Sequence, residues 1–214
     1  MDEEITIIDT NTRNKKIKNF FINNKKRLIV GFSIILILII SYLSIKEMKE
    51  RKKIKLASQY NITIINFKTE AKQKTISQLT KLINENDATY SPLALYFLMD
   101  NNLLDNKIKV NTLFDELINE TSLDEEIKNL IIYKKALFNS DFSTENNLLQ
   151  ILNPIINSES IWKSHSLYLL AEYFYSKNEK KKAKEFFNQI LLLSNANVDI
   201  KIKSQKRINR DLGE

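Results

Sequence analysis

Leu28 to Ile45 reads LIVGFSIILILIISYLSI, eighteen consecutive residues without a charged side chain. As an α-helix this stretch is about 27 Å long at roughly 1.5 Å per residue, close to the ~30 Å hydrocarbon core of a bilayer. Basic residues bound both ends: Lys25 to Arg27 precede the stretch, and five of the residues 46–53 are Lys or Arg. The sequence therefore predicts a transmembrane helix over 28–45.

Two other interpretations of this stretch are a buried core helix and a cleaved signal peptide. The dense charge at both ends disfavours a core helix. A signal peptide needs a small-residue cleavage site after its apolar region, whereas Ser44 to Lys53 reads SIKEMKERKK. We therefore expect an uncleaved anchor.

The distribution of charge does not decide which end of this anchor faces the cytoplasm. Residues 1–27 hold seven basic side chains and residues 46–55 hold six, so the positive-inside comparison is close to a tie. Long domains translocate largely regardless of charge. We expect residues 1–27 to be a short basic cytoplasmic tail and residues 46–214 to be a folded domain outside, with a cytoplasm-facing domain as the alternative.

Most of the positive charge belongs to the anchor region. Residues 1–53 contain 12 basic and 6 acidic side chains, whereas residues 54–214 contain 21 and 20. Anionic lipid headgroups explain the basic flanks of the span. An almost neutral domain predicts no nucleic-acid partner.

The composition removes most catalytic chemistry. The chain has no cysteine, one histidine and only two glycines, Gly31 and Gly213. Thiolate metal sites, disulfides and phosphate-binding glycine loops are therefore excluded. Glu125 and Glu126 form a carboxylate pair, but acids at a helix start favour the helix dipole. We expect neither an enzyme nor a cofactor or metal site.

Beyond the span, apolar residues recur at helical spacing and polar residues mark the boundaries. The first helix is expected to continue upward from the span, because nothing between Ser44 and Ile54 breaks it. Expected helix starts are Ser91 with Pro92, the capping box that begins at Ser122, Ser143 or Thr144, Ser160, and Asp199. Pro154 is expected to end or bend its helix, and Asn178 is expected to take a left-handed conformation at a corner.

The repeat pattern is tetratricopeptide-like. Ala171 is followed by an aromatic residue at +3, a small residue at +12 and an aromatic residue at +16. The residues expected to pack the repeats are Ala136, Leu170, Ala171, Phe174, Ala183 and Phe187. Ala136 lies 35 residues before Ala171, with Leu148 and Leu152 at +12 and +16. The fold class predicted is all-α: one N-terminal transmembrane helix followed by a tetratricopeptide-like stack of helix pairs, with a generic helical bundle as the alternative.

This layout resembles a known family. Ile17 to Lys25 carries a Phe-Phe pair before an apolar span with Gly31 near its start, and the 167–187 unit follows in the helical domain. It resembles the bacterial single-span ancillary subunit of the SecYEG translocon. That resemblance implies an inner-membrane protein with a periplasmic domain, in contact with the translocon and with periplasmic chaperones. The sequence departs from the family at Asn24, where Gly is frequent, in its longer tail and in its middle repeats.

A candidate binding groove follows from the repeat alignment. Tyr133 and Tyr168 stand three residues before equivalent alanines, and Tyr175 lies one turn after Ala171. Helix-pair solenoids line their concave face with the first helix of each pair, and tyrosines suit peptide capture. Ordinary packing between repeats explains these tyrosines equally well. His165 and Trp162 are expected to serve packing or surface roles.

The function predicted is a membrane-anchored scaffold that binds protein near the export machinery. An envelope-complex assembly factor and a cytoplasm-facing adaptor are the alternatives.

Overall fold

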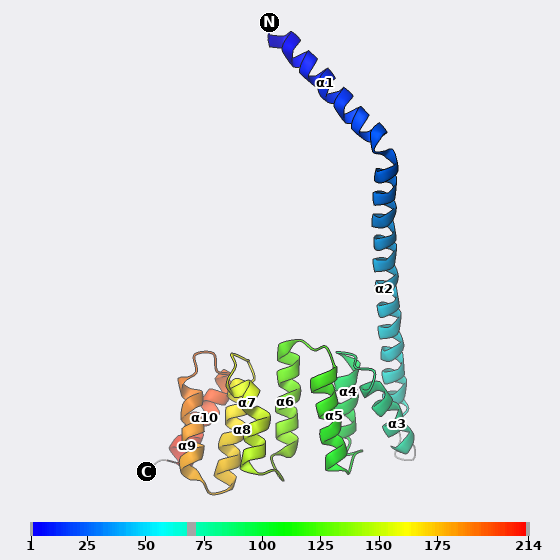
Figure 1. Ribbon diagram of the computed structural model, residues 1–214. Coiled ribbons are helices and arrows are strands. Elements are labelled where there is room, and N and C mark those ends of the chain that lie inside the picture. Colours follow the sequence, from blue (N-terminus) through cyan, green and yellow to red (C-terminus); the bar gives the residue numbers. More distant parts are fainter. Residues whose placement is uncertain (1, 68–71, 213–214) are drawn as a thin grey trace. The chain divides into compact units, whose positions relative to one another are not determined.

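The computed structural model describes residues 2–67 and 72–212, and within these ranges the chain forms ten helices and no strand (Figure 1). The helices are α1 (Asp2–Asn23), α2 (Lys25–Ile65), α3 (Lys72–Ile83), α4 (Tyr90–Asp100), α5 (Lys107–Glu120), α6 (Glu125–Asn139), α7 (Glu145–Ile156), α8 (Lys163–Ser176), α9 (Lys180–Leu192) and α10 (Val198–Asp211). The predicted all-α class is confirmed. The chain divides into two units, residues 1–55 and residues 56–214.

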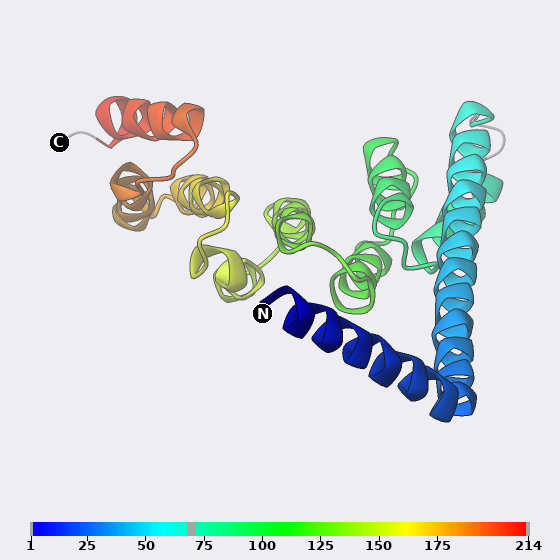
Figure 2. The ribbon, with the colours of Figure 1, turned by 90° about the horizontal axis from the view of Figure 1, so that it is seen from above.

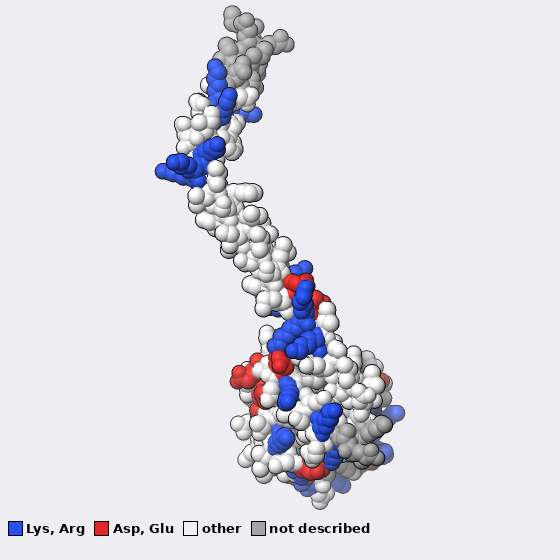
Figure 3. All heavy atoms as spheres, turned by 90° about the vertical axis from the view of Figure 1, so that its right-hand side faces the viewer, with Lys and Arg blue, Asp and Glu red and all other residues white. Residues whose placement is uncertain are grey.

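In the first unit, α2 contains the predicted span. The 18-residue apolar window of α2 has none of its residues buried, and among the described residues α2 is the one helix long and apolar enough to cross a membrane. Figure 3 shows this uncharged length with Lys and Arg gathered at both of its ends. At about 1.5 Å per residue, the whole of α2 extends roughly 60 Å, about twice the hydrocarbon thickness. The expected continuation of the helix beyond the span is confirmed, because α2 runs unbroken to Ile65.

In the second unit, short connections return the chain after each helix. Helix α8 contacts its sequence neighbours α7 and α9, and also α6 and α10, which lie two helices away. Seen from above, α4, α6, α8 and α10 form one row, and α5, α7 and α9 form the other (Figure 2). A two-row arrangement places alternate helices beside one another, so side chains far apart in the sequence share one face.

The core of this unit consists of two buried clusters. The first gathers apolar residues from the end of α2 through α6, including Leu56 of α2. The second extends from α6 to α10 and contains all six residues expected to pack the repeats: Ala136, Leu170, Ala171, Phe174, Ala183 and Phe187, each at most 1% exposed. Small side chains at Ala171 and Ala183 allow α8 and α9 to approach closely, and the ring of Phe174 stacks on Phe186 with centroids 5.4 Å apart.

Asparagine takes the conformation that glycine usually supplies at helix ends. Among the described residues, the non-glycine positions with positive φ are Asn86, Asn102 and Asn178. The prediction for Asn178 is confirmed, with φ at 62°. There the N–H of Glu179 donates to the carbonyl of Phe174 at 2.9 Å, a Schellman closure of α8. Asn102 closes α4 in the same way.

The predicted N-cap at Ser91 is wrong. Helix α4 begins at Tyr90, and the carboxylate of Asp87 accepts from the N–H groups of Thr89 and Tyr90 at 2.9 and 2.8 Å. The hydroxyl of Ser91 is buried and donates to the carbonyl of Leu82 at 2.7 Å. A carboxylate is the better partner for a helix N-terminus, which leaves Ser91 to join α4 to α3.

The predicted capping box at Ser122 is also wrong, because α6 begins three residues later, at Glu125, without a side-chain cap. Ser160 lies three residues before the start of α8, where its hydroxyl accepts from the N–H of Trp162 at 3.1 Å and donates to Glu126 at 2.8 Å. That tie to α6 holds the entry to α8.

The remaining boundaries agree with the sequence or were not anticipated. Of the two expected starts of α7, Ser143 and Thr144, the structure has Thr144 as the cap. Pro154 lies inside the last turn of α7, which continues to Ile156. The side chain of Asn106 caps α5 by accepting from two backbone N–H groups, and this start is not among the expected ones.

The packing at Phe174 gives a first prediction. Phe174→Ala removes a ring that is 1% exposed, so the free energy of unfolding of the stack is expected to fall by about 3–5 kcal/mol. Urea unfolding of the detergent-solubilised chain, followed through the fluorescence of its single tryptophan, measures this loss. Leu192→Ala is the matched control, because Leu192 is 85% exposed. Equal losses in the two variants would contradict the assigned core.

Candidate functional site

Within the described ranges, 2–67 and 72–212, no group of three or more His, Asp or Glu side chains is placed to hold a metal ion. The most distinctive grouping is aromatic. We use "aromatic face" for five side chains: Tyr133 of α6, Trp162, which immediately precedes α8, and His165, Tyr168 and Tyr175 of α8. These side chains are half-buried.

At one end of the aromatic face three rings meet. The ring of Tyr133 stacks on Trp162, with centroids 5.7 Å apart and planes 22° apart. The imidazole of His165 lies 5.2 Å from the Trp162 ring and 6.0 Å from the Tyr133 ring. The internal repeat spacing singled out Tyr133, and the structure adds Trp162 and His165 as its neighbours.

A shallow cleft of about 360 Å³ opens beside these rings. Its lining residues are Ile161, Trp162, His165, Asn195 and Asn197. Ile161 is 63% exposed, so a large apolar side chain and an indole edge lie together at the surface, beside two amides from the connection between α9 and α10. Apolar and aromatic side chains next to hydrogen-bonding amides are typical of a protein-contact surface.

His165, the chain's single histidine, is half-buried beside these rings. Its Nδ1 atom is buried without a hydrogen-bond partner among the described residues. Burial lowers the pKa of His165. The backbone of Ile161 raises the pKa, and the positive charge of Lys203 lowers it, so that the pKa lies below its ordinary value. A lowered pKa favours the neutral imidazole, which has one ring nitrogen able to accept a hydrogen bond.

Tyr168 and Tyr175 lie further along α8, and each packs against a different partner. The ring of Tyr168 meets Phe187 edge-on at 5.5 Å. Burial, reinforced by Glu172, raises the pKa of Tyr168 to about 12. The guanidinium of Arg207 lies 4.2 Å above the ring of Tyr175. The predicted groove tyrosines therefore also serve packing between helices.

Arg207 joins α10 to α8 at this point. Its Nε and Nη2 atoms donate to the two carboxylate oxygens of Glu172, at 2.7 and 2.5 Å. It also pairs with Asp211. The hydrogen bond from Arg210, followed by that from Arg207, lowers the pKa of Asp211 to about 2. A planar guanidinium held by two carboxylates fixes one side of the aromatic face.

A second, smaller cleft of about 170 Å³ lies between α4 and α6. The ammonium of Lys134 lies 4.6 Å above the ring of Tyr96. The Tyr96 hydroxyl is buried without a partner among the described residues, and burial raises its pKa well above the ordinary value of 10. The sequence pattern does not single out Tyr96 or Lys134, because neither stands at one of the repeat positions that the Ala136–Ala171 spacing defines.

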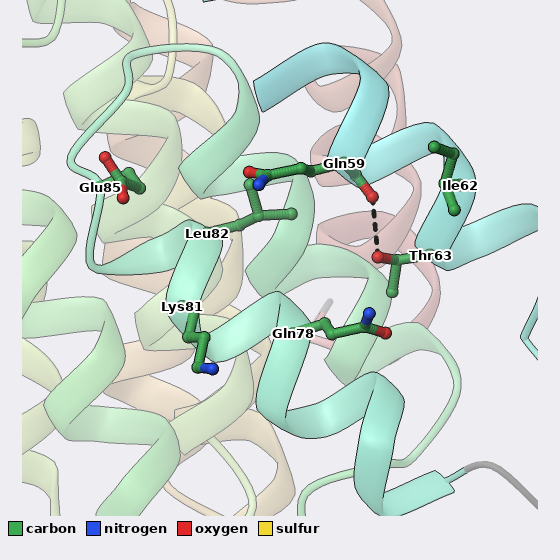
Figure 4. Close-up of a pocket in the computed structure, with 7 residues that line it drawn as sticks. All are labelled: Gln59, Ile62, Thr63, Gln78, Lys81, Leu82 and Glu85. Atoms are coloured by element: carbon green, nitrogen blue, oxygen red, sulfur yellow. Dashed lines mark hydrogen bonds between the residues drawn. The ribbon is translucent and has the colours of Figure 1, made fainter. Parts of the chain in front are cut away.

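Another cleft, of about 370 Å³, lies between the end of α2 and α3 (Figure 4). Its lining mixes amides, charges and apolar groups: Gln59, Ile62, Thr63, Gln78, Lys81, Leu82 and Glu85. The hydroxyl of Thr63 donates to the carbonyl of Gln59 at 2.7 Å and is thereby satisfied within its own helix. This cleft lacks the clustered aromatic rings found on α6 and α8.

No protein-family model, curated protein or solved structure matches this chain.

The buried hydroxyl of Tyr96 gives the second prediction. Tyr96→Phe removes a hydroxyl without a protein partner, so the free energy of unfolding is expected to stay unchanged or to rise. Tyr173→Phe is the matched variant, because the Tyr173 hydroxyl donates to the carbonyl of Ser143 at 3.0 Å. Losing that bond is expected to cost about 1 kcal/mol. Urea unfolding measures both, and a larger loss for Tyr96→Phe would show that its hydroxyl is bonded in the folded chain.

Proposed function

We propose that this chain is a single-span membrane protein whose helical stack binds another protein through the aromatic face. The observation that carries the proposal is the half-exposed stack of Tyr133 on Trp162, beside the exposed Ile161. Trp and Tyr are the residue types that most often dominate protein-binding energy, and large apolar surface groups mark contact sites. The absence of cysteine and the near-absence of glycine agree with a binding role rather than a catalytic one.

The stack itself is proposed to be tetratricopeptide-like. Ala136 and Ala171 are 35 residues apart, and both are fully buried in the same cluster. Leu148 and Leu152 on α7 are buried as Ala183 and Phe187 are on α9. The contacts of α8 with α6 and α10 join helices of the same row, as in repeats whose first helices line one concave surface.

The partner is proposed to belong to the protein-export machinery. The resemblance of the layout to the ancillary subunit of SecYEG supports the translocon or a periplasmic chaperone as the partner, with the amino terminus cytoplasmic and the stack periplasmic. An assembly factor for envelope complexes would use the same surface. Anionic lipid at the basic flanks of the span completes the set of proposed partners.

The binding proposal is tested by site-specific photocrosslinking. A benzophenone amino acid at Ile161 lies at the surface, whereas Tyr168 is half-buried against Phe187. In membranes from bacterial cells that produce the full chain, we expect a defined adduct, identified by mass spectrometry as an export or envelope protein. Trp162→Ala should weaken its formation, because losing such an anchor costs about 2 kcal/mol, or roughly 30-fold in affinity.

The matched control carries the same amino acid at Ile108, which is 79% exposed at the start of α5 in the other row. An adduct of equal yield at Ile108, or no adduct at Ile161 in a folded chain, would contradict the proposed face.

The orientation is tested separately by reporters fused after residue 214. Alkaline phosphatase folds only when exported and green fluorescent protein fluoresces only when it remains inside, so we expect phosphatase activity without fluorescence. The same fusions to a chain that lacks residues 28–45 are the control and should reverse the result. Fluorescence from the full-length fusion would instead support the cytoplasm-facing adaptor.

A further inference from the structure

The last turns of α1 expose an apolar face immediately before the span. Ile17, Phe20 and Phe21 are 49%, 57% and 57% exposed. They stand at positions i, i+3 and i+4 and therefore share one side of the helix. The rings of Phe20 and Phe21 meet edge-on at 5.9 Å. Asn19, two residues from Ile17, lies on the opposite side.

The same segment is strongly basic. Residues 13–27 contain seven Lys or Arg side chains and no Asp or Glu. These basic side chains are exposed, and Figure 3 shows them between the span and the amino-terminal end. Exposed aromatic and aliphatic side chains among a surplus of basic ones, next to a candidate span, are found in segments that lie in the membrane interface.

Asn24 bends the chain between α1 and α2. Its Nδ2 atom donates to the carbonyl of Phe20 at 3.0 Å, and the same carbonyl accepts from the backbone N–H of Asn24 at 3.0 Å. A side chain that enters the backbone ladder in this way is a recognised cause of helix kinks. In Figure 1, α1 leaves the axis of α2 at this point.

The bend between α1 and α2 changes how far Phe20 and Phe21 lie from the bilayer surface. Phe20 and Phe21 precede Leu28 by seven or eight residues, about 11 Å at roughly 1.5 Å per residue. Along a straight helix they would lie at or beyond the headgroups, whereas a helix that bends at Asn24 keeps them closer to the bilayer surface. Residues of both α1 and α2 line an apolar cleft of about 470 Å³ at the bend: Phe21, Ile22, Lys25, Leu28, Ile29 and Phe32.

We propose that residues 13–32 bind anionic phospholipid, with α1 lying in the interface of the membrane that α2 crosses. Ile17, Phe20 and Phe21 enter the boundary between headgroups and acyl chains. An acyl chain occupies the apolar cleft, and Lys25 at its edge meets the phosphate. Continuity with the span places the segment at the bilayer surface, and its uniform positive charge complements anionic headgroups. This inference rests on the proposed membrane span and its proposed lipid contact, and it is independent of what the stack binds.

Spin-label accessibility in nanodiscs tests the depth of α1. Because the chain contains no cysteine, Ile17→Cys and Asn19→Cys each give a single labelled position while both phenylalanines stay in place. The full-length chain is reconstituted in phosphatidylcholine with one quarter phosphatidylglycerol. We expect the label at position 17 to collide more with oxygen than with a water-soluble nickel complex, and the label at position 19 to show the reverse.

Four further arms identify the cause of any insertion. Pure phosphatidylcholine, 0.5 M salt, or Lys15→Gln with Lys16→Gln and Lys18→Gln should each lower oxygen access at position 17, because each weakens the attraction to anionic lipid. Phe20→Ser with Phe21→Ser should lower it as well. Unchanged Trp162 fluorescence confirms that the stack is intact in every variant.

Equal aqueous access at positions 17 and 19 in anionic nanodiscs would overturn the proposal. Protection of position 17 in native membranes but not in these nanodiscs would also overturn it, because a protein would then cover the apolar face. Insertion that does not depend on phosphatidylglycerol or on the lysines would refute the anionic-lipid assignment.

Discussion

Backbone hydrogen bonding in lipid is the constraint from which the architecture starts. A segment in the hydrocarbon core must satisfy its own N–H and C=O groups, and α2 is able to do so through eighteen uncharged residues, none of which is buried by the described part of the chain. The same helix continues to Ile65 and contributes Leu56, 3% exposed, to the first core cluster of the stack. The continuous helix α2 thus carries both the apolar window and a residue of the first core cluster.

The stack is built from a chain that has almost no glycine. Its close helix contacts depend on alanine at Ala136, Ala171 and Ala183, which are fully buried. Its sharp helix ends depend on asparagine at positive φ. Asparagine tolerates the left-handed region better than other residues with a Cβ, so the chain can turn tightly after α4 and α8 without the freedom that glycine adds to the unfolded state.

The aromatic side chains between α6, α8 and α10 both pack helices and face solvent. Tyr168 and Tyr175 are held by Phe187 and Arg207, which gives the surface a fixed shape. Tyr133, Trp162 and Ile161 extend that surface to the cleft beside the α9–α10 connection. A preorganised surface loses little side-chain entropy on binding, so packing and recognition are compatible roles for these rings. At the other end of the chain, Ile17, Phe20 and Phe21 form a second exposed apolar surface next to the bend at Asn24.

The sequence by itself determined the features that depend on neighbours a few residues away. The uncharged run, the helical spacing of apolar residues, the cap at Thr144 and the left-handed Asn178 are all properties of one or two turns of chain. Tertiary structure decided the rest. Ser91 and Ser160 read as caps, but the first bonds to α3 and the second to Glu126 of α6. Arg207 pairs with Glu172, which lies 35 positions earlier in the chain. Lys134 lies over the ring of Tyr96, which lies 38 positions earlier. Such contacts follow from which helices lie beside one another, and local periodicity does not specify that.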